Sequence, residues 1–194
     1  MKIFLIFLSA FLVNNIVLMR FLGLCPYIGV SSNLSSAIGM SFAVLFVMLM
    51  ASWITYAIYK FVLVPLNIVY LRTSTFILTI ATLVQIVEMF LHKKAKELYD
   101  ALGIYLPLIT TNCAILGTAF LVIENKYTFL EATVFAIGTA FGFMIALTLM
   151  AGIRERLELA DLPESFKGAP IAFVMASLMA LAFLGFVGLL GLSI

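Results

Sequence analysis

The two cysteines of the chain, Cys25 and Cys113, are the residues whose type and spacing most directly indicate chemistry. Each begins a Cys-x-x-x-Gly segment, and an Ala-Ile-Gly-x-x-Phe segment follows each of them, at 37–42 and at 136–141. Thiolates are soft ligands for zinc and for iron–sulfur clusters, which usually take four protein ligands. Two thiols at equivalent places in a duplicated chain therefore predict half of a four-thiolate metal site.

The composition indicates that these thiols lie in a membrane. The chain is 65% hydrophobic and only 10% charged, with a mean hydropathy of +1.25, whereas a soluble domain has about a quarter charged residues. Six windows are continuously apolar over the roughly 20 residues that a spanning helix needs, and barrel strands would alternate instead. The windows are 3–22, 36–59, 68–90, 101–123, 131–153 and 170–192. We predict a single all-α integral membrane domain, 1–194, and the net charge of +2 gives no indication of nucleic acid binding.

Three windows in each half make an odd number, so the second half must insert upside down relative to the first. The predicted fold is thus a 3+3 inverted repeat of six transmembrane helices, with halves of about 1–95 and 96–194. The cysteines are 88 residues apart and the Ala-Ile-Gly segments 99 apart, which implies an insertion of eleven residues between Gly117 and Ala136. Helix-disrupting and polar residues beside each cysteine predict interruptions of the first and fourth helices.

Lysine and arginine bias predicts the orientation, because loops on the inner side of a membrane carry more of them. With the N-terminus outside, seven basic residues face inside and four face outside. The inside set is Arg20, Lys93, Lys94, Lys96, Arg154, Arg156 and Lys167, and the outside set is Lys2, Lys60, Arg72 and Lys126. We therefore expect both termini outside.

The cysteines allow three interpretations. Each could be a buried small hydrophobe, the two could form a disulfide in a quinone-linked thiol oxidoreductase, or they could bind a metal. The only histidine, His92, falls in a charged loop and is a poor third ligand. A metal site would then need two thiolates from another chain, most simply a homologous one. Free backbone N–H groups and the hydroxyls of Thr110 and Thr111 are suited to hydrogen-bond its sulfur atoms.

Several longer stretches resemble one family of membrane proteins. They are Leu12-Val13-Asn14-Asn15, Phe21-Leu22-Gly23-Leu24-Cys25-Pro26, Pro65-Leu66-Asn67-Ile68-Val69-Tyr70-Leu71-Arg72-Thr73, Leu102-Gly103-Ile104, Leu106-Pro107-Leu108-Ile109-Thr110-Thr111-Asn112-Cys113-Ala114, Ile153-Arg154-Glu155-Arg156-Leu157 and Ala160-Asp161 with Pro163. Over nearly its whole length the chain resembles the RnfA/NqrE family, which comprises one membrane component of the Rnf ion-translocating complexes and one of the sodium-pumping NADH:quinone reductases. The resemblance is closer to the Rnf branch.

The resemblance implies a function for the two cysteines. Family members pair with a homologous membrane subunit of opposite orientation, RnfE-like in the Rnf complex, and two cysteines from each of the two proteins hold one [2Fe–2S] cluster. Electrons then cross the bilayer between iron–sulfur and flavin subunits, in a ferredoxin:NAD oxidoreductase coupled to sodium or proton transport. On this chain the ligand role falls on Cys25 and Cys113. The resemblance also implies a multi-pass protein of a bacterial or archaeal cytoplasmic membrane, with no active site of its own.

The remaining polar and small residues carry weaker hypotheses. Thr110, Thr111, Asn112, Gly29 and Gly117 are candidates to surround a cluster, with inter-helix hydrogen bonding and close helix packing as the alternatives. The same alternatives apply to Asn14 and Asn15 and to Gly39, Gly138 and Gly142. Glu88, the only acidic residue well inside a predicted span, could mark an ion path or reach the interface. Two other functions stay open: an ion or solute transporter with incidental cysteines, and a structural protein that only holds partners together.

Overall fold

A computed structural model describes residues 2–66, 68–94, 108–109, 111–160, 163 and 166–186. Every regular element in these ranges is a helix, as predicted. In chain order they are α1 (Lys2–Leu8), the π-helix η1 (Ser9–Val13), α2 (Leu24–Gly29), α3 (Leu34–Ile58), the π-helix η2 (Tyr59–Leu63), the 3-10 helix η3 (Val69–Leu71), α4 (Arg72–Lys94), α7 (Cys113–Glu124), α8 (Phe129–Glu158) and α9 (Ala169–Leu184).

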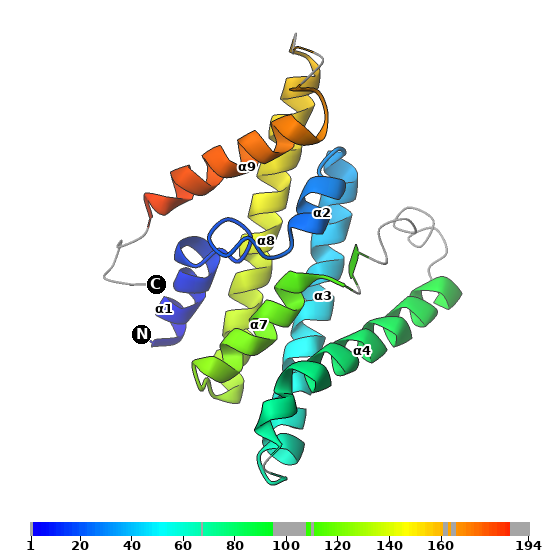
Figure 1. Cartoon of the computed structure of the whole chain (residues 1–194), viewed down its shortest axis with the longest axis vertical. Helices are drawn as coiled ribbons and strands as arrows, with labels where there is room; N and C mark the ends of the chain where they lie inside the picture. Colours follow the sequence, from blue (N-terminus) through cyan, green and yellow to red (C-terminus); the bar gives the residue numbers. More distant parts are fainter. Residues whose placement is uncertain are drawn as a thin grey trace.

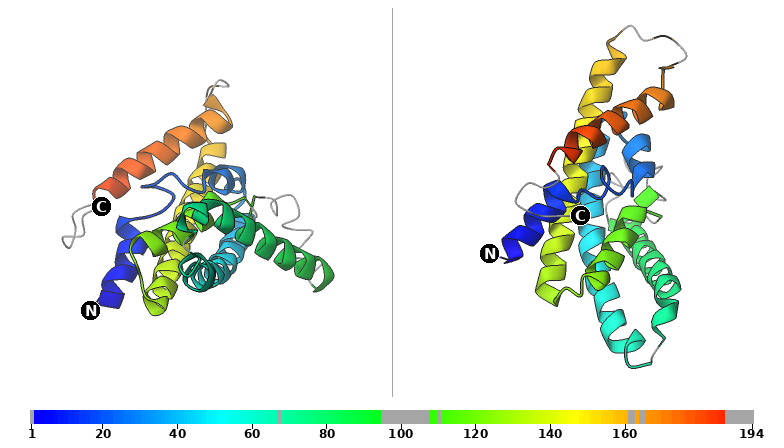
Figure 2. Two further views of the ribbon diagram at one scale, coloured as in Figure 1. Left: turned by 60° about the horizontal axis from the view of Figure 1, so that its bottom comes forward. Right: turned by 60° about the vertical axis from the view of Figure 1, so that its left-hand side comes forward.

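The long helices α3 and α8 form the centre of the molecule and run antiparallel (Figures 1 and 2). Leu34–Leu63 and Phe129–Glu158 are each 30 residues long and apolar enough to cross a membrane. Small residues dominate the buried face of α8, such as Ala136, Ala140 and Ala146, each with 0% exposure. Because lipid chains give helices little hydrophobic reason to associate, small side chains that allow close approach stabilise such a pair.

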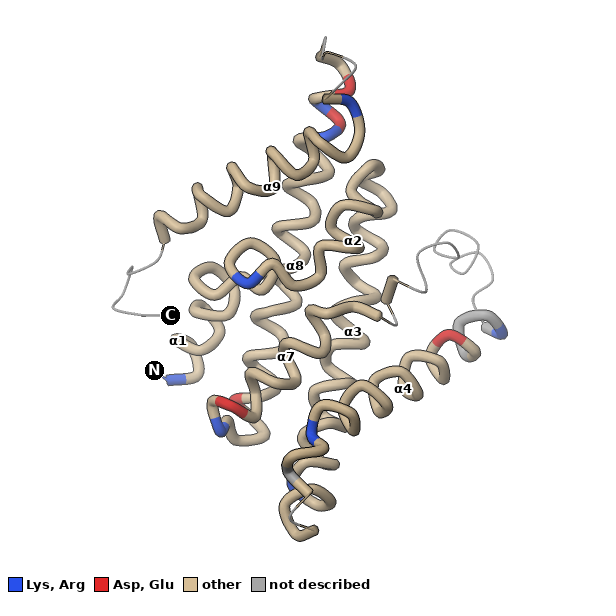
Figure 3. The backbone as a smooth tube through the Cα atoms, viewed as in Figure 1, with Lys and Arg blue, Asp and Glu red and all other residues tan. Residues whose placement is uncertain are grey.

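The outer surface of the helices is apolar, and the charges lie mainly at their ends. Phe46, Phe173 and Leu181 are 53%, 55% and 65% exposed on the surfaces of α3 and α9. Figure 3 shows uncharged stretches along the middle of the long helices, with lysine, arginine and acidic residues near the ends and turns. A surface of this kind matches the hydrocarbon core and the two interfaces of a bilayer.

The predicted interruption of the first helix is present, but the window 3–22 is wrong in its bounds. The helical part ends with η1 at Val13, residues 14–23 are irregular, and α2 begins at Leu24. Asn15 satisfies the broken backbone, since its Oδ1 accepts from the N–H groups of Val17 and Leu18 at 3.0 and 3.3 Å. Arg20 therefore lies within this interruption, between η1 and α2.

The other windows agree with the helices to within a few residues where the structure describes them. Windows 36–59, 68–90, 131–153 and 170–192 correspond to α3, α4, α8 and α9. The fourth window, 101–123, is described only in part: Leu108 and Ile109 are helical, Thr111 and Asn112 are not, and α7 begins at Cys113.

The eleven-residue difference between the two motif spacings is accounted for by helical residues. Both cysteine-bearing helices are followed by a four-residue turn and then by one of the two long helices. Gly29 ends α2, whereas α7 continues for seven residues past Gly117 to Glu124. Three residues precede Ala37 in α3, whereas seven precede Ala136 in α8. This difference accounts for the remaining four of the eleven residues. The insertion therefore lengthens both helices and leaves the turn between them unchanged in length.

Candidate metal-ligand site

Cys25 is the second residue of the short helix α2, which begins after an abrupt turn of the chain. Gly23, directly before the helix, has φ +81° and ψ 27°, a left-handed conformation that other residues adopt only at a cost. Phe21 also has a positive φ, 55°. The turn lets the chain re-enter a helix immediately, and it leaves the Cys25 thiol free and exposed on the surface of the chain.

Cys113 is the first residue of α7, and its thiol is also free and exposed. Asn112 precedes it and caps the helix, because its Oδ1 accepts from the N–H of Ala114 at 3.0 Å. The Cys113 Sγ lies 3.8 Å from the carbonyl oxygen of Thr111. Cys113 thus lies at the N-terminus of a 12-residue helix, where backbone N–H groups are not used within the helix.

The starts of the two cysteine-bearing helices pack against each other. A Cβ placed on Gly23 would lie 3.0 Å from the Ala114 Cβ and 3.1 Å from the Asn112 Oδ1, so the two backbones approach closely there. Gly23 is two residues before Cys25, and two of its three close contacts are the sequence neighbours of Cys113. Residues 88 apart in sequence are thus brought to one region of the surface.

The Asn112 side chain has one half of its amide unpaired. The residue is 3% exposed, and its Nδ2 has no hydrogen-bond partner in the described part of the chain. A buried amide N–H₂ without an acceptor is unfavourable by about 1–3 kcal/mol. A sulfur atom bound beside Cys113 is one acceptor that could satisfy it, so the site retains a donor suited to a metal–sulfur group.

A buried asparagine fixes the interruption to the long helix behind it. Asn15 is fully buried and its Nδ2 donates to the Gly142 carbonyl at 2.8 Å, near the middle of α8. A Cβ on Gly142 would lie 2.9 Å from the Phe11 carbonyl oxygen, and one on Gly138 2.9 Å from the Phe7 carbonyl oxygen. For Asn15, Gly138 and Gly142 the structure therefore favours inter-helix contact and close packing.

Arg154 holds the other end of α2, a contact that the sequence did not predict. The charge count assigned Arg154 to a loop, which is wrong, because the residue lies in α8. Its Nη1 donates to the Ile28 carbonyl at 2.7 Å and to the Ser31 Oγ at 2.9 Å. The cation thus satisfies a carbonyl in the last turn of the helix that carries Cys25. The only signal in the sequence was a basic residue directly after a long apolar window.

The other predicted site residues differ from one another in what they contact. Gly117 faces Leu22, whose Cδ1 would lie 2.6 Å from an added Cβ, whereas Gly29 makes only an ordinary contact at 3.8 Å with Leu108. Gly39 has nothing within 4 Å of an added Cβ, so the prediction that it allows close packing is wrong. Thr111 is exposed beside Cys113, and Thr110 lies outside the described residues.

Glu88 does not join the cysteine site. It lies in α4, half-buried, and makes no hydrogen bond or ion pair with another residue of the described ranges. An ion path at this position stays a prediction.

The donor set of this chain is chemically incomplete for a cluster. Among the described residues, no group of three or more His, Cys, Asp or Glu side chains could hold a metal ion. Two exposed thiols on contacting helix starts fit one side of a four-thiolate group, provided that a second surface supplies the remaining ligands.

Proteins of similar sequence are known, and they match nearly the whole chain. Residues 3–190 match the family model described as Rnf-Nqr subunit, membrane protein. The chain is 53% identical over 189 residues to the A subunit of the Na(+)-translocating ferredoxin:NAD(+) oxidoreductase complex of Acetobacterium woodii. The matched residues make up 97% of this chain and 98% of that protein. It is 54% identical over 188 residues to the A subunit of an ion-translocating oxidoreductase complex from Syntrophotalea carbinolica, with 97% of each chain covered. The corresponding protein of Shewanella sediminis is 53% identical over 185 residues, covering 95% of this chain and 96% of that one.

Proposed function

The chain belongs to the Rnf-Nqr family of membrane-protein subunits, and from this premise we propose that it relays electrons as the A subunit of an ion-translocating oxidoreductase complex. The observation that carries the proposal is the close approach of Gly23, two residues before Cys25, to Asn112 and Ala114 on either side of Cys113, together with the exposure of both cysteines. The reaction would be the ferredoxin:NAD type named for the Acetobacterium woodii relative, coupled to sodium or proton movement.

We propose further that the two thiolates are ligands of a [2Fe–2S] cluster shared with a homologous RnfE-like protein. Such a cluster supplies one-electron transfer within the membrane when it is bound. This chain contributes the two thiolates, the helix N-terminus beneath Cys113 and the unpaired Nδ2 of Asn112 as a donor. Both cysteines are exposed on this chain, which leaves room for a partner surface. The further partners would be the iron–sulfur and flavin subunits of the complex.

The proposed setting is the cytoplasmic membrane of the cell, with six spans in a 3+3 inverted repeat. Three observations support this arrangement: the break between η1 and α2, the non-helical residues before α7, and the antiparallel course of α3 and α8. The basic residues at the two ends of α8, Lys126 and Arg154, are the ones that the charge count assigned to opposite sides. Both termini would then lie outside.

Spectroscopy of the purified complex tests the cluster. With Cys25→Ser or Cys113→Ser, we expect the same [2Fe–2S] EPR signal to disappear and iron to fall by about two atoms per complex. The signals of the other iron–sulfur subunits serve as the internal control, and chromatography confirms that the complex still assembles. If every iron–sulfur signal survives both substitutions, the relay proposal is wrong; ion flux that also survives would favour the transporter alternative. A complete cluster on this chain purified alone would contradict only the shared site.

A further inference from the structure

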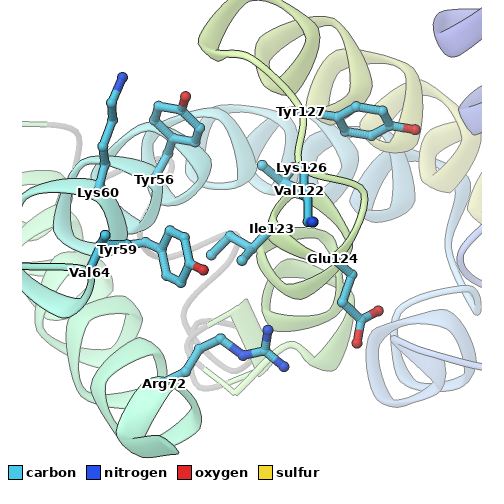
Figure 4. A pocket seen from close by; sticks show the side chains of 10 residues that line it. All are labelled: Tyr56, Tyr59, Lys60, Val64, Arg72, Val122, Ile123, Glu124, Lys126 and Tyr127. Atoms are coloured by element: carbon cyan, nitrogen blue, oxygen red, sulfur yellow. The ribbon is translucent and has the colours of Figure 1, made fainter. Parts of the chain in front are cut away.

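A second site lies at the end of the bundle away from Arg154, where no cysteine is found. It is a cavity of about 420 Å³ between the end of α3 with η2, the start of α4, and the turn that joins α7 to α8. Figure 4 shows its lining, which includes Tyr59, Lys60, Arg72, Glu124 and Lys126. Segments from four parts of the chain thus converge on one pocket, whose largely apolar lining carries several charged side chains.

The pocket carries uncompensated positive charge. It has three basic side chains, Lys60, Arg72 and Lys126, against one carboxylate, Glu124. None of the four makes an ion pair with a side chain of the described ranges. The excess of two positive charges makes this pocket a site that attracts anions.

Arg72 is held in position for such a ligand. Its guanidinium carbon lies 5.1 Å from the centre of the Phe120 ring, a cation–π contact that orders the side chain. In Figure 4 it points toward the side chains of Tyr59 and Glu124, and the Tyr59 hydroxyl also points into the pocket. A planar guanidinium with a nearby hydroxyl suits the oxygen atoms of a phosphate group.

Aromatic side chains of the kind found at membrane interfaces lie beside the pocket. Trp53 and Tyr56, on the preceding turns of α3, pack on Phe129 with ring centres 6.3 and 5.8 Å apart, and the Trp53 Nε1 donates to Thr133 at 3.0 Å. Aromatic side chains with one polar end collect at the headgroup level. A headgroup-level position of these rings would bring the phosphates of phospholipids close to the pocket.

We propose that this pocket binds a phosphate-bearing anion, and that Arg72 and Lys126 are its principal contacts. The anion can be the headgroup of an acidic phospholipid or free phosphate, which share the same oxygen chemistry. Basic pockets between transmembrane helices commonly hold acidic lipid headgroups. Because this pocket is separate from the cysteines, a negative result for anion binding would not affect the electron-relay proposal.

Native mass spectrometry of the full chain in a nonionic detergent tests the site. The probes are phosphatidylglycerol, phosphatidylcholine with the same acyl chains, and inorganic phosphate. The pocket variant is Arg72→Gln with Lys126→Asn, since asparagine tolerates the left-handed φ of 52° at position 126. The matched control, Arg156→Gln with Lys167→Gln, removes the same charge near the other end of α8. The charge-retaining pair Arg72→Lys with Lys126→Arg completes the set.

We expect the pocket variant to bind phosphatidylglycerol about thirtyfold more weakly, because each cation near an anionic headgroup strengthens binding about fivefold. The control should change less than threefold, and the charge-retaining pair should recover most of the loss. If inorganic phosphate binds instead, and only in chains with an intact pocket, the ligand is the soluble anion. If the pocket variant does not fold, the single change Lys126→Asn in the exposed turn should still weaken binding about fivefold. Equal phosphatidylglycerol binding by native, pocket and control chains, with no phosphate binding, would overturn the proposal.

Discussion

The junction between the two cysteine-bearing helices predicts a large effect for the smallest substitution, Gly23→Ala. Position 23 has φ +81°, and an alanine there is unfavourable by about 1–2 kcal/mol. Its methyl would lie 3.0 Å from the Ala114 Cβ and 3.2 Å from the ring of Phe143. Carbon atoms prefer about 3.5–4.0 Å, and overpacking of this degree costs about 1–3 kcal/mol. Together these give a loss of about 2–5 kcal/mol in the free energy of unfolding.

Gly39→Ala is the matched control, since the side chain added is the same. Gly39 is inside α3 with nothing within 4 Å of an added Cβ, so alanine there should stabilise the helix by about 0.5–1 kcal/mol. The two variants should therefore differ by about 3–6 kcal/mol, with opposite signs relative to the native chain.

The single tryptophan provides the assay. Trp53 of α3 donates to Thr133 of α8 at 3.0 Å, so its fluorescence reports the separation of the two long helices. Unfolding of the full chain would be followed by titrating a denaturing detergent into mixed micelles. In the intact complex, Gly23→Ala should also lower the iron content while Gly39→Ala leaves it unchanged. The reasoning is refuted if Gly23→Ala shifts the free energy by less than about 0.5 kcal/mol, a change typical of an unconstrained surface site.

Three further predictions concern contacts that hold the interrupted helix and the long helix. Asn15→Ala should destabilise the chain by about 2–4 kcal/mol in the same titration, since the Gly142 carbonyl and two backbone N–H groups lose a buried partner; a loss under about 1 kcal/mol would contradict this. Arg154→Gln should loosen α2 and at least double the rate at which a maleimide labels Cys25, because two charge-assisted hydrogen bonds are lost. Arg156→Gln is the control and should leave the labelling rate unchanged. Equal labelling rates in the two variants would exclude a positioning role for Arg154. Glu131→Ala should lose the capping bond to the Thr128 N–H at 3.0 Å and lower the unfolding midpoint of the chain; an unchanged midpoint would show that the cap contributes nothing.

The sequence was sufficient for the features that depend on local composition. Continuous apolar runs predict α3 and α8 because a segment in lipid can satisfy its backbone only as a helix. The motifs around both cysteines predict the family, which the comparisons confirm. The bounds of the window 3–22 were wrong because a hydropathy window measures average apolar content. That average stays high over residues 14–23 despite Asn14, Asn15 and Arg20, although the backbone leaves the helix there.

Some roles depend on groups that are distant in sequence. Asn15 and Gly142 are 127 residues apart, and Arg154 is 126 residues from Ile28, so no local pattern indicates either bond. The pocket of Arg72 and Lys126 likewise combines a helix start with a turn more than 50 residues later. In each case a polar group of an otherwise apolar chain contacts a partner that is close in space but distant in sequence. The tertiary fold determines which residue that partner is.

The sequence alone thus determined that the chain is helical and membrane-embedded, that it belongs to one family, and that Cys25 and Cys113 are its candidate ligands. These conclusions follow from residue types and their order. Only the tertiary structure decided that the two cysteines begin helices in mutual contact and that both thiols are exposed. The reason is physical: the left-handed turn at Gly23 and its fit against Asn112 and Ala114 exist only when both halves of the chain have packed around α8.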